Sequence, residues 1–472
     1  MRRSAAGILA LALVGGCAVG PDYRRPDVGV GAAYKEAVGW KTAEPRDEAN
    51  RGNWWKVFGD ASLSALMEGI DISNQNVILA AARFRQAQAL VAVSRSGLFP
   101  ALDANAAFTR SRSPTGAIGG TTAGRDINTR SVGLGSSWEI DLWGRLRRAL
   151  ESSAASAQAS AADLAAARLS AQAELASNYF QLRILDAQKQ LLDDTVGAFG
   201  KSLELTRNRY ASGVAAKVDV VQAETQLKST QAQAIDIGVQ RAQLEHAIAI
   251  LIGKPPSEFS IAPAPLAASM PRIPPGLPSE LLERRPDVAA AERRTASANA
   301  QIGVARAAFF PSLTISASGG YRSAEAADLF TAPSRFWSIG PAIAQSIFDA
   351  GLRRAQTEQA IAAYDASVAQ YRQAVLAGFQ EVEDNLAALR ILEEEAQVQE
   401  DAVSAARESV TLTLNQYKAG TASYLNVVTA QTTQLANERT AVGILGRRLV
   451  AAVTLVKALG GGWSTSELAA TE

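Results

Sequence analysis

The sequence predicts a mostly helical protein with a small β part, in which one long helical hairpin occurs twice. Residues 205–225 return without a gap as residues 412–432, with the Asn, Tyr, Gly and paired Val positions preserved. A second match aligns residues 95–102 with 306–313 through an Arg, a Phe, a Pro and a Leu. Each half also contains two stretches in which polar and apolar residues alternate. Because repeats of this length determine architecture, we expect two copies of one unit made of a helix, two strands and a hairpin.

Each copy of the first repeat predicts the tip of a helical hairpin. It lies between long segments rich in Ala, Gln and Leu that contain no proline. A Gly flanked by small residues between two such segments is typical of a helix that ends and restarts. We therefore place the tips at about 210–218 and 417–425. The segment from about 144 to 209 would form a helix roughly 100 Å long, and apolar spacings of three and four predict coiled-coil-like packing along it.

The alternating stretches predict four β-strands, each with one apolar and one polar face. In the second stretch, Val132, Leu134 and Trp138 alternate with Gly, Ser and Glu. A period of two residues is the signature of such strands. Pro341 lies inside the fourth stretch and cannot donate a ladder hydrogen bond, so we expect that strand to bend there. The four strands are expected at about 101–110, 130–142, 312–322 and 335–348.

The segments outside the repeats differ from them in composition. Residues before the first helix are rich in Gly, Pro and charge, and Trp54 and Trp55 are expected to pack on the body of the protein. A Pro-rich segment joins the two halves. The predicted organisation is a signal peptide at 1–16, an extended N-terminal segment at 17–72, a first repeat at 73–252, a linker at 253–283, a second repeat at 284–459 and a tail at 460–472.

The N-terminus resembles a bacterial lipoprotein signal. Arg2 and Arg3 precede a short apolar run, which is too short to span a bilayer. The sole cysteine, Cys17, follows Gly15 and Gly16, where such a signal requires its acylated thiol. The alternative is an ordinary signal peptide with an incidental cysteine. A covalent lipid on Cys17 is the only added group that we expect, and a single acyl chain would hold the protein only weakly to a membrane.

Composition argues against several classes of function. The formal net charge is +1, which does not favour nucleic-acid binding. The chain contains one His and one Cys, so it has almost no material for a His-based catalytic triad or a His/Cys metal site. We therefore expect neither an enzyme nor a metal site.

Aromatic residues lie at both ends of the predicted strands. Two belts of aromatic side chains separated by the length of a strand are typical of the two interfaces of a bilayer. The alternative is a sheet in a soluble domain with its apolar face inward. The belt nearest the helices would contain Phe99, Trp143, Phe310 and Phe348, and the belt at the loop ends would contain Phe108, Tyr321, Phe336 and Trp337.

Four strands cannot close a barrel, and open strand edges are not tolerated in lipid. Single-chain barrels begin at about eight strands. A membrane sheet of this size therefore requires oligomerisation, and a trimer would supply twelve strands. The long helices of the same three chains would continue that barrel as a helical tube.

Five stretches resemble the outer-membrane efflux channels of the TolC-like kind, and specifically their lipoprotein (NodT-type) branch. The resemblance covers nearly the whole mature chain. It implies a homotrimer with a shared twelve-stranded transmembrane β-barrel, anchored by lipid in the outer membrane, and a trimeric α-barrel in the periplasm. It also implies docking to a periplasmic adaptor and an inner-membrane RND pump, as a passive exit duct for drugs or toxic compounds. The stretches are CAVGPDYRRP (17–26), NWWKVFGDASLSALM (53–67), NRYASGVAAKVDVVQAE (208–224), LLERRPDVAAAERR (281–294) and GVARAAFFPSL (303–313).

The resemblance implies that a closed gate is held at the hairpin tips by bonds between neighbouring chains. The bonded pairs would be Tyr210 with Asp219 and Tyr417 with Asn426. A phenol can donate a strong hydrogen bond to a carboxylate, and Arg207 and Arg209 could add charge-assisted bonds. The alternative is that Asp219 and Asn426 only cap the returning helices.

Two further features of the tips follow from the resemblance. Gly213 and Gly420 would be turn glycines that also contact the adaptor, or turn glycines alone. Relatives often carry carboxylates at the positions of Asn426 and Thr429. We therefore expect Asp219 to supply the only tip carboxylate, and the gate to attract cations less than in those relatives.

Two other functions fit parts of this pattern. The same fold could serve as the outer-membrane duct of a type I protein secretion system. A periplasmic lipoprotein scaffold without a pore would instead form no trimer and conduct no ions. The sequence does not identify the transported molecule, because the lumen of a wide duct selects weakly.

Overall fold

The computed structural model describes residues 18–29, 33–36, 53–112, 126–266, 270–271, 273 and 284–465. The predicted signal peptide, Cys17 and the last part of the predicted linker, residues 274–283, lie outside these residues. The chain divides into two compact units. The first contains the four strands and the helix segments that adjoin them, drawn from residues up to 27, 84–160 and 291–371. The second contains both hairpins, drawn from residues 28–83, 161–290 and 372–472.

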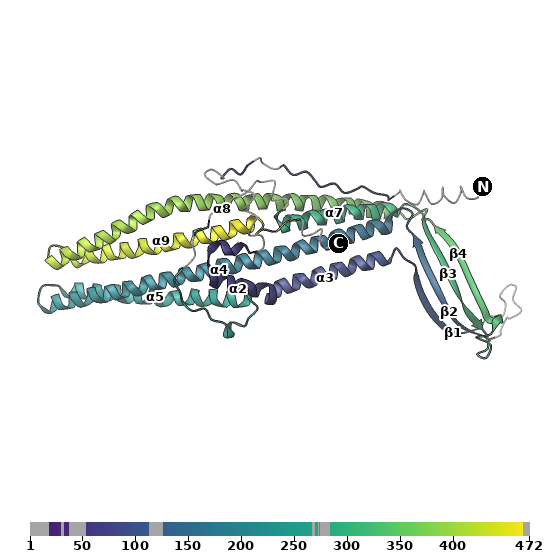
Figure 1. Cartoon of the computed structure of the whole chain (residues 1–472), viewed down its shortest axis with the longest axis horizontal. Coiled ribbons are helices and arrows are strands. Elements are labelled where there is room, and N and C mark those ends of the chain that lie inside the picture. Colours follow the sequence, from purple (N-terminus) through teal and green to yellow (C-terminus); the bar gives the residue numbers. More distant parts are fainter. Residues whose placement is uncertain are drawn as a thin grey trace. The chain divides into compact units, whose positions relative to one another are not determined.

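The described chain is mostly helical with one small sheet, which confirms the predicted fold class (Figure 1). Its elements repeat in the predicted order of helix, two strands and helical hairpin. The helices are α2 (Ala61–Ser73), α3 (Gln75–Ser96), α4 (Arg145–Ala211), α5 (Lys217–Leu251), α7 (Pro286–Ala307), α8 (Leu352–Ala419) and α9 (Tyr424–Ala458), and the strands are β1 (Ala101–Arg112), β2 (Asp126–Ile140), β3 (Ser312–Ser323) and β4 (Arg335–Ala344).

Helix α2 lies in the segment that the sequence predicted to be extended. Asp60 begins this helix, since its Oδ1 accepts a hydrogen bond from the N–H of Leu63 at 3.0 Å. Leu63, Met67 and Ile70 then recur at helical spacing and are all buried. The two tryptophans before α2 are also buried, and Trp54 donates from Nε1 to Gln172 at 3.1 Å. The apolar period of three to four residues, not the Gly and Pro content upstream, determines the structure here.

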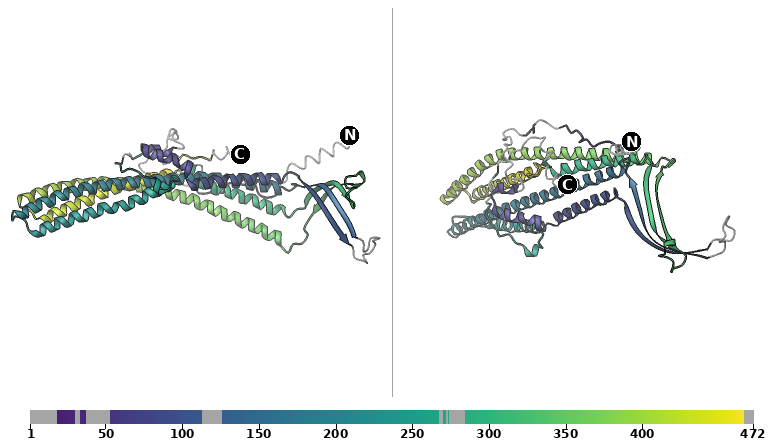
Figure 2. Two further views of the ribbon diagram at one scale, coloured as in Figure 1. Left: turned by 90° about the horizontal axis from the view of Figure 1, so that it is seen from below. Right: turned by 45° about the vertical axis from the view of Figure 1, so that its right-hand side comes forward.

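Both hairpins pair a long helix with a shorter returning helix. Helices α4 and α8 contain 67 and 68 residues, and α5 and α9 contain 35 residues each. Each returning helix lies beside its long partner down to the tip in every view (Figure 2). Their contact surface is lined by Leu, Val, Ala and Ile side chains, with aromatic residues added near the tip. No helix in the described part of the chain combines the length and the hydropathy needed to cross a bilayer.

A buried ion network holds the start of the linker against the first hairpin. Asp186 of α4 pairs with Arg183 at 3.0 Å and with Arg241 of α5 at 2.8 Å. The same two guanidinium groups donate to the carbonyl oxygens of Ala262 and Ile261. The side chain of Asp186 is only 5% exposed. The linker is therefore fixed where it leaves the hairpin, by charged side chains of both α4 and α5.

The second unit contains the same joint twice, where a returning helix ends beside the start of a shorter helix. In the first repeat, Asn74 donates from Nδ2 to the carbonyl oxygen of Leu251 at the end of α5, at 2.7 Å. In the second repeat, Arg285 donates from Nη1 to the carbonyl oxygen of Ala458 at the end of α9, at 3.3 Å. Arg285 also pairs with Glu381 at 2.7 Å. The donor at this joint is a neutral amide in the first repeat and a charged guanidinium in the second.

Gly460 follows the second joint with a φ of 90°, a conformation that residues with a side chain seldom adopt. A Cβ atom at this position would collide with the carbonyl oxygen of Arg284. We therefore expect Gly460→Ala to lower the free energy of unfolding by about 3 kcal/mol, from left-handed strain and overpacking together. The midpoint of thermal unfolding in detergent measures this loss.

Gly443, inside α9, provides the matched control. A Cβ atom there would meet no heavy atom within 4 Å. Because Gly is a poor helix former, Gly443→Ala is expected to leave stability unchanged or to raise it by about 0.5–1 kcal/mol. A Gly460→Ala protein that melts at or above the temperature of the wild type would show that the joint tolerates a side chain.

Candidate functional site

The four strands form one antiparallel sheet in the order β1-β2-β3-β4. Residues paired across neighbouring strands share a face. Ala104 pairs with Leu134, Leu134 with Gly319, and Gly319 with Trp337, so the apolar positions of all four strands lie on one face. The other face carries Asp, Asn, Ser and Thr side chains. The apolar face is made by Leu102, Ala104, Ala106, Phe108, Val132, Leu134, Trp138, Ile140, Leu313, Ile315, Ala317, Tyr321, Trp337, Ile339, Pro341 and Ile343.

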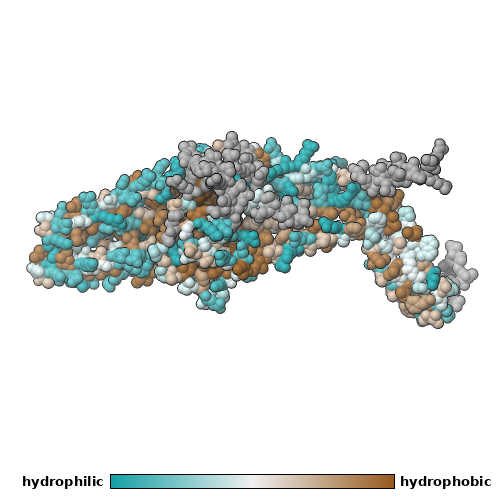
Figure 3. All heavy atoms as spheres, in the orientation of Figure 1, coloured by the Kyte–Doolittle hydropathy of each residue, from teal (hydrophilic) through white to brown (hydrophobic). Residues whose placement is uncertain are grey.

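No side chain of the four strands is buried within the described structure. Leu102 is 70% exposed and Trp337 is 81% exposed. In Figure 3 the sheet is mostly white and brown, with few teal residues. Soluble proteins rarely expose an apolar face of this extent. The alternative of a soluble sheet with its apolar face inward is not what the chain forms, since the described chain buries no side chain of that face.

The strand ends differ in part from those predicted. Strand β2 begins at Asp126 instead of about 130, and β4 ends at Ala344 instead of about 348. Pro341 pairs with Ile315 in β4, which is an edge strand of this sheet, where a missing N–H is tolerated. Phe348 therefore lies beyond the sheet, and its side chain is 88% exposed.

The predicted aromatic residues at the helix end of the sheet include one stacked pair. Phe310 stacks on Trp143 with ring centroids 4.7 Å apart, and Trp143 donates from Nε1 to the carbonyl oxygen of Pro311 at 2.8 Å. Phe99 is 66% exposed. These residues follow the last turns of α3 and α7 or precede the first turn of α4.

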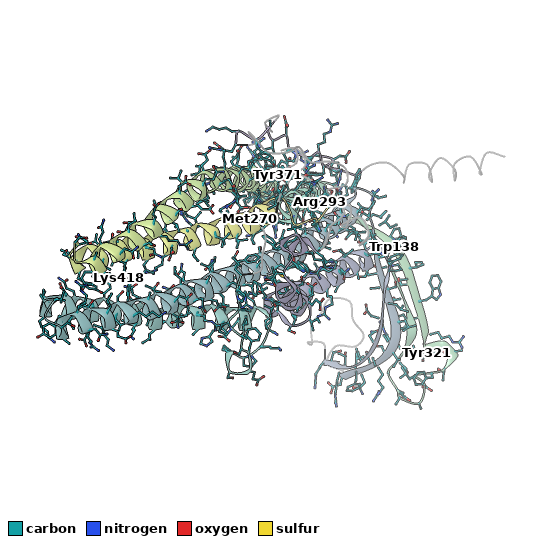
Figure 4. All side chains as sticks on the ribbon, turned by 60° about the vertical axis from the view of Figure 1, so that its left-hand side comes forward. Trp138, Met270, Arg293, Tyr321, Tyr371 and Lys418 are labelled. Atoms are coloured by element: carbon teal, nitrogen blue, oxygen red, sulfur yellow. The ribbon has the colours of Figure 1, made fainter. Side chains whose placement is uncertain are left out.

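At the loop end, Phe108, Tyr321 and Trp337 lie on the apolar face. Figure 4 shows Tyr321 at the far end of the sheet from Trp138. Phe336 pairs with Gly320 and therefore lies on the polar face, where the guanidinium of Arg322 is 4.8 Å from its ring centroid. Since neighbouring residues of a strand point to opposite faces, Phe336 and Trp337 cannot share one belt.

The two hairpin tips have the same turn. The N–H of Gly213 donates to the carbonyl oxygen of Tyr210 at 2.9 Å, and the N–H of Gly420 donates to that of Tyr417 at 3.0 Å. The φ angles of Gly213 and Gly420 are 77° and 80°. This left-handed residue after the last helical turn is a common way for a helix to end. Both glycines are exposed at the end of their hairpins.

The tips of the two hairpins are joined within one chain through Tyr417. This side chain is 4% exposed, and its ring packs against Tyr424 with centroids 5.3 Å apart. Its hydroxyl lies 3.5 Å from Thr206 Oγ1 of the other hairpin. Arg209 places its guanidinium 4.8 Å from the Tyr417 ring centroid and donates to the carbonyl oxygen of Lys418 at 2.9 Å. Figure 4 shows Lys418 at the tip of the second hairpin.

Burial raises the pKa of Tyr424 to about 12, and the nearby Tyr417 and Asp219 add to the shift. Asp219 is therefore close enough to act on the buried tyrosine pair electrostatically. Tyr424 was not predicted at the gate, because its counterpart in the first repeat is Lys217. The tyrosine pair therefore belongs to the second repeat alone, and a search for residues preserved between the two repeats does not find it.

The other predicted gate residues are more exposed. Tyr210 is 45% exposed, and Lys217 Nζ lies 5.5 Å from its ring centroid. Asp219 is half-buried in the first turn of α5, and Asn426 is exposed. Within the described chain no hydrogen bond joins Tyr210 to Asp219 or Tyr417 to Asn426, so a bond between neighbouring chains stays a prediction.

The alternative capping role of these two residues is wrong. The residues at the N-cap positions of α5 and α9 are Ala216 and Ser423, and neither makes a side-chain capping bond. Asp219 and Asn426 lie three residues further along. In that position the carboxylate of Asp219 can interact with the dipole of α5, but it does not begin the helix.

The first described residues are bound along the helices of the sheet unit. The N–H of Val19 donates to the carbonyl oxygen of Trp143 at 2.9 Å, and Arg148 pairs with Asp22 at 2.7 Å. Tyr23 donates to Glu292, and Arg293 lies over its ring. Arg293 and Tyr371 are labelled in this region in Figure 4. The chain is thus held in place from Val19 to Tyr23, shortly after Cys17.

The family model described as outer membrane efflux protein matches residues 70–254 and 277–461, one match for each repeat. The chain belongs to the outer membrane efflux protein family. The resemblance drawn from the sequence motifs is thereby confirmed.

Individual members of the outer membrane efflux protein family are similar to this chain over most of their length. The probable efflux pump outer membrane protein TtgC of Pseudomonas putida strain KT2440 is 31% identical over 454 residues, covering 96% of this chain and 94% of TtgC. The pyoverdine export outer membrane protein OpmQ of Pseudomonas aeruginosa is 33% identical, with 89% of each chain covered. The solved outer-membrane channel OprN superposes with a TM-score of 0.89 at 32% identity, covering 95% of this chain and all of that one.

Membership of this family assigns the main features of the protein. It is an outer-membrane component of an efflux pump, with a helical barrel in the periplasm. The sheet with a bare apolar face is the part that lies in the membrane, and the hairpins are the periplasmic part.

Proposed function

We propose that three copies of this chain form one passive exit duct for small molecules such as drugs or toxic compounds. The observation that carries the proposal is a four-stranded sheet with a bare apolar face and two unpaired edges, β1 and β4. Unpaired strand edges are too costly in hydrocarbon. Three chains would pair each β4 with the β1 of a neighbour and close a barrel of twelve strands, with no enzymatic step.

The partners follow from the same assembly. A duct in the outer membrane needs a pump that supplies energy and a connector that reaches it. We assign these roles to an inner-membrane RND pump and a periplasmic adaptor. The exposed turns at Gly213 and Gly420 have the same geometry, so a trimer would present six such turns to the adaptor.

Light scattering and conductance together test the duct. Protein extracted in detergent is expected to weigh close to three times the 49.6 kDa of the full-length chain. The same material is expected to conduct ions in a planar bilayer. A particle with the mass of one chain that conducts no current would instead support a periplasmic scaffold without a pore.

We also propose that Cys17 carries the lipid that anchors the N-terminus. Residues 18–22 are bound beside Trp143 and Arg148, at the helix end of the sheet, so an acyl chain on Cys17 would start near the proposed interface. Radiolabelled palmitate is expected to label the wild type and not Cys17→Ser. Equal labelling of both proteins would exclude lipidation at this residue.

The proposed gate uses Tyr210 and Asp219 of neighbouring chains. Asp219 is the only acidic residue within 210–221 and 417–428. A trimer would therefore carry one carboxylate per chain at its tip. Since a unit charge attracts a cation 4 Å away by about 1 kcal/mol in water, we expect Asp219→Asn to reduce the cation-to-anion permeability ratio at least twofold, measured as a reversal potential in a salt gradient.

Asp236, which is exposed on the same helix, provides the control. It lies roughly 25 Å from Asp219 along α5. Asp236→Asn is expected to change the permeability ratio much less. Unchanged selectivity in Asp219→Asn would mean that Asp219 does not face the ion path.

A further inference from the structure

Helices α3 and α7 end in the same exposed pair of an arginine and a phenylalanine. Arg95 precedes Phe99 by four residues, and Arg306 precedes Phe310 by four residues. The chain leaves both helices through the same turn. The N–H groups of Phe99 and Phe310 donate to the carbonyl oxygens three residues earlier, each at 3.1 Å. Each phenylalanine lies in the turn between the end of its helix and the strand that follows, β1 or β3.

The two arginines differ from the others at this end of the sheet. On the adjoining ends of α4 and α8, Arg145 pairs with Glu139, Arg147 with Asp141, and Arg353 with Asp349. Arg95 and Arg306 are both exposed, and the described residues offer neither of them a hydrogen-bond or ion-pair partner. At this end of the sheet, the described residues pair Arg145, Arg147 and Arg353 with carboxylates, and they offer no such partner to the two arginines at the Phe-Pro junctions.

An exposed arginine and an exposed aromatic ring four residues apart, at the edge of an apolar face, are suited to a lipid headgroup. The ring fits the boundary between headgroups and acyl chains. The arginine can extend to the phosphate and bind it with two parallel hydrogen bonds. Two cations to which the described residues offer no counter-charge also favour a lipid with net negative charge.

We propose that Arg95 and Arg306 are binding sites for the phosphate of anionic phospholipids in the periplasmic leaflet. The proposal rests on the proposed function, since it requires the sheet to lie in the membrane with its helix end toward the periplasm. Each chain carries the site twice, at the bases of β1 and β3. The sites would help to fix the depth of the sheet in the bilayer, together with the aromatic residues at the strand ends.

The test measures how strongly the protein selects phosphatidylglycerol over phosphatidylethanolamine. The full-length protein is reconstituted in bilayers that contain both lipids, gently extracted, and analysed by native mass spectrometry for the lipids that remain bound. The variant is Arg95→Gln/Arg306→Gln. The wild type is expected to retain phosphatidylglycerol preferentially, and the variant is expected to lose about fivefold in preference for each arginine.

Arg85→Gln/Arg372→Gln removes the same charge from exposed arginines away from the strands. Arg85 lies roughly 15 Å from Arg95 along α3, beyond the Debye length at physiological salt. This control is expected to keep the preference of the wild type. Conductance of every protein is measured in parallel, so that loss of the channel is distinguished from loss of lipid selection.

A variant that conducts normally and retains as much phosphatidylglycerol as the wild type would overturn the lipid site and leave the duct intact. An equal loss in both double variants would also overturn it, because the effect would then be one of net charge. If no protein conducts and no particle exceeds one chain in mass, the proposed function fails first.

Discussion

Arg209→Ala is expected to raise the ratio of open to closed channels roughly 30-fold. In the described chain, Arg209 bonds one hairpin tip to the other through two contacts, with the carbonyl oxygen of Lys418 and with the ring of Tyr417. A hydrogen bond from a charged donor and a cation–π contact together contribute about 2 kcal/mol. Losing them favours separation of the hairpins, and a difference of this size changes a population ratio roughly 30-fold. Single-channel recording in planar bilayers measures the open fraction.

Arg207 supplies the control for this prediction, because it lies two residues away and carries the same charge. It pairs with Glu224 at 3.7 Å, and both side chains are at least half exposed. An ion pair of this kind contributes little, so Arg207→Ala is expected to open the channel far less. Equal open fractions in the two variants would indicate that tip charge, and not the contact between hairpins, holds the gate closed.

Asp186→Ala is expected to lower the free energy of unfolding by about 3 kcal/mol, since it leaves two buried guanidinium groups without their shared carboxylate. The side chains of Asp186 and Arg183 are 5% and 6% exposed, and that of Arg241 is 18% exposed. The change also removes an acceptor for the N–H of Ala264 in the linker. Chemical denaturation followed by circular dichroism measures the loss, and faster proteolysis near Ala264 is expected to accompany it.

Asp193→Ala tests whether the position or the charge matters. Asp193 lies on the same helix and pairs with Lys189, but both side chains are more than 40% exposed. Exposed pairs contribute about 0–1 kcal/mol. If Asp193→Ala destabilised the protein as much as Asp186→Ala, burial of the network would not explain the effect.

The repeat pattern predicted more of this protein than local propensity did. The identical residues in 205–225 and 412–432 placed both tips, and the structure has the same turn at Gly213 and Gly420. Local composition was less reliable. It suggested an extended chain through residues that form α2, because the Gly and Pro residues nearby concealed an apolar period of Leu63, Met67 and Ile70.

In the sheet too, the sequence pattern predicted part of the structure, and the pairing of the strands decided the rest. Alternation predicted four strands and the apolar set of each one. It could not assign Phe336, because two adjacent aromatics fit either phase of a strand, and only pairing with Gly320 places that ring on the polar face. The end of β4 also depended on its partner, since β3 offers no further residue beyond Ser312 to pair with.

By itself, the sequence determined the duplication, the two hairpins and their turns, and the polarity of the four strands, because each of these depends on the spacing of residues along one stretch of chain. The tertiary structure decided which of the tip side chains are buried and which are exposed. Tyr417 and Tyr210 are equivalent in the repeat, yet one is 4% exposed and the other 45%. The difference arises because Tyr417 packs between two hairpins against Tyr424 and Arg209, and its contact with Arg209 joins positions more than two hundred residues apart. No periodicity within a single segment contains that information.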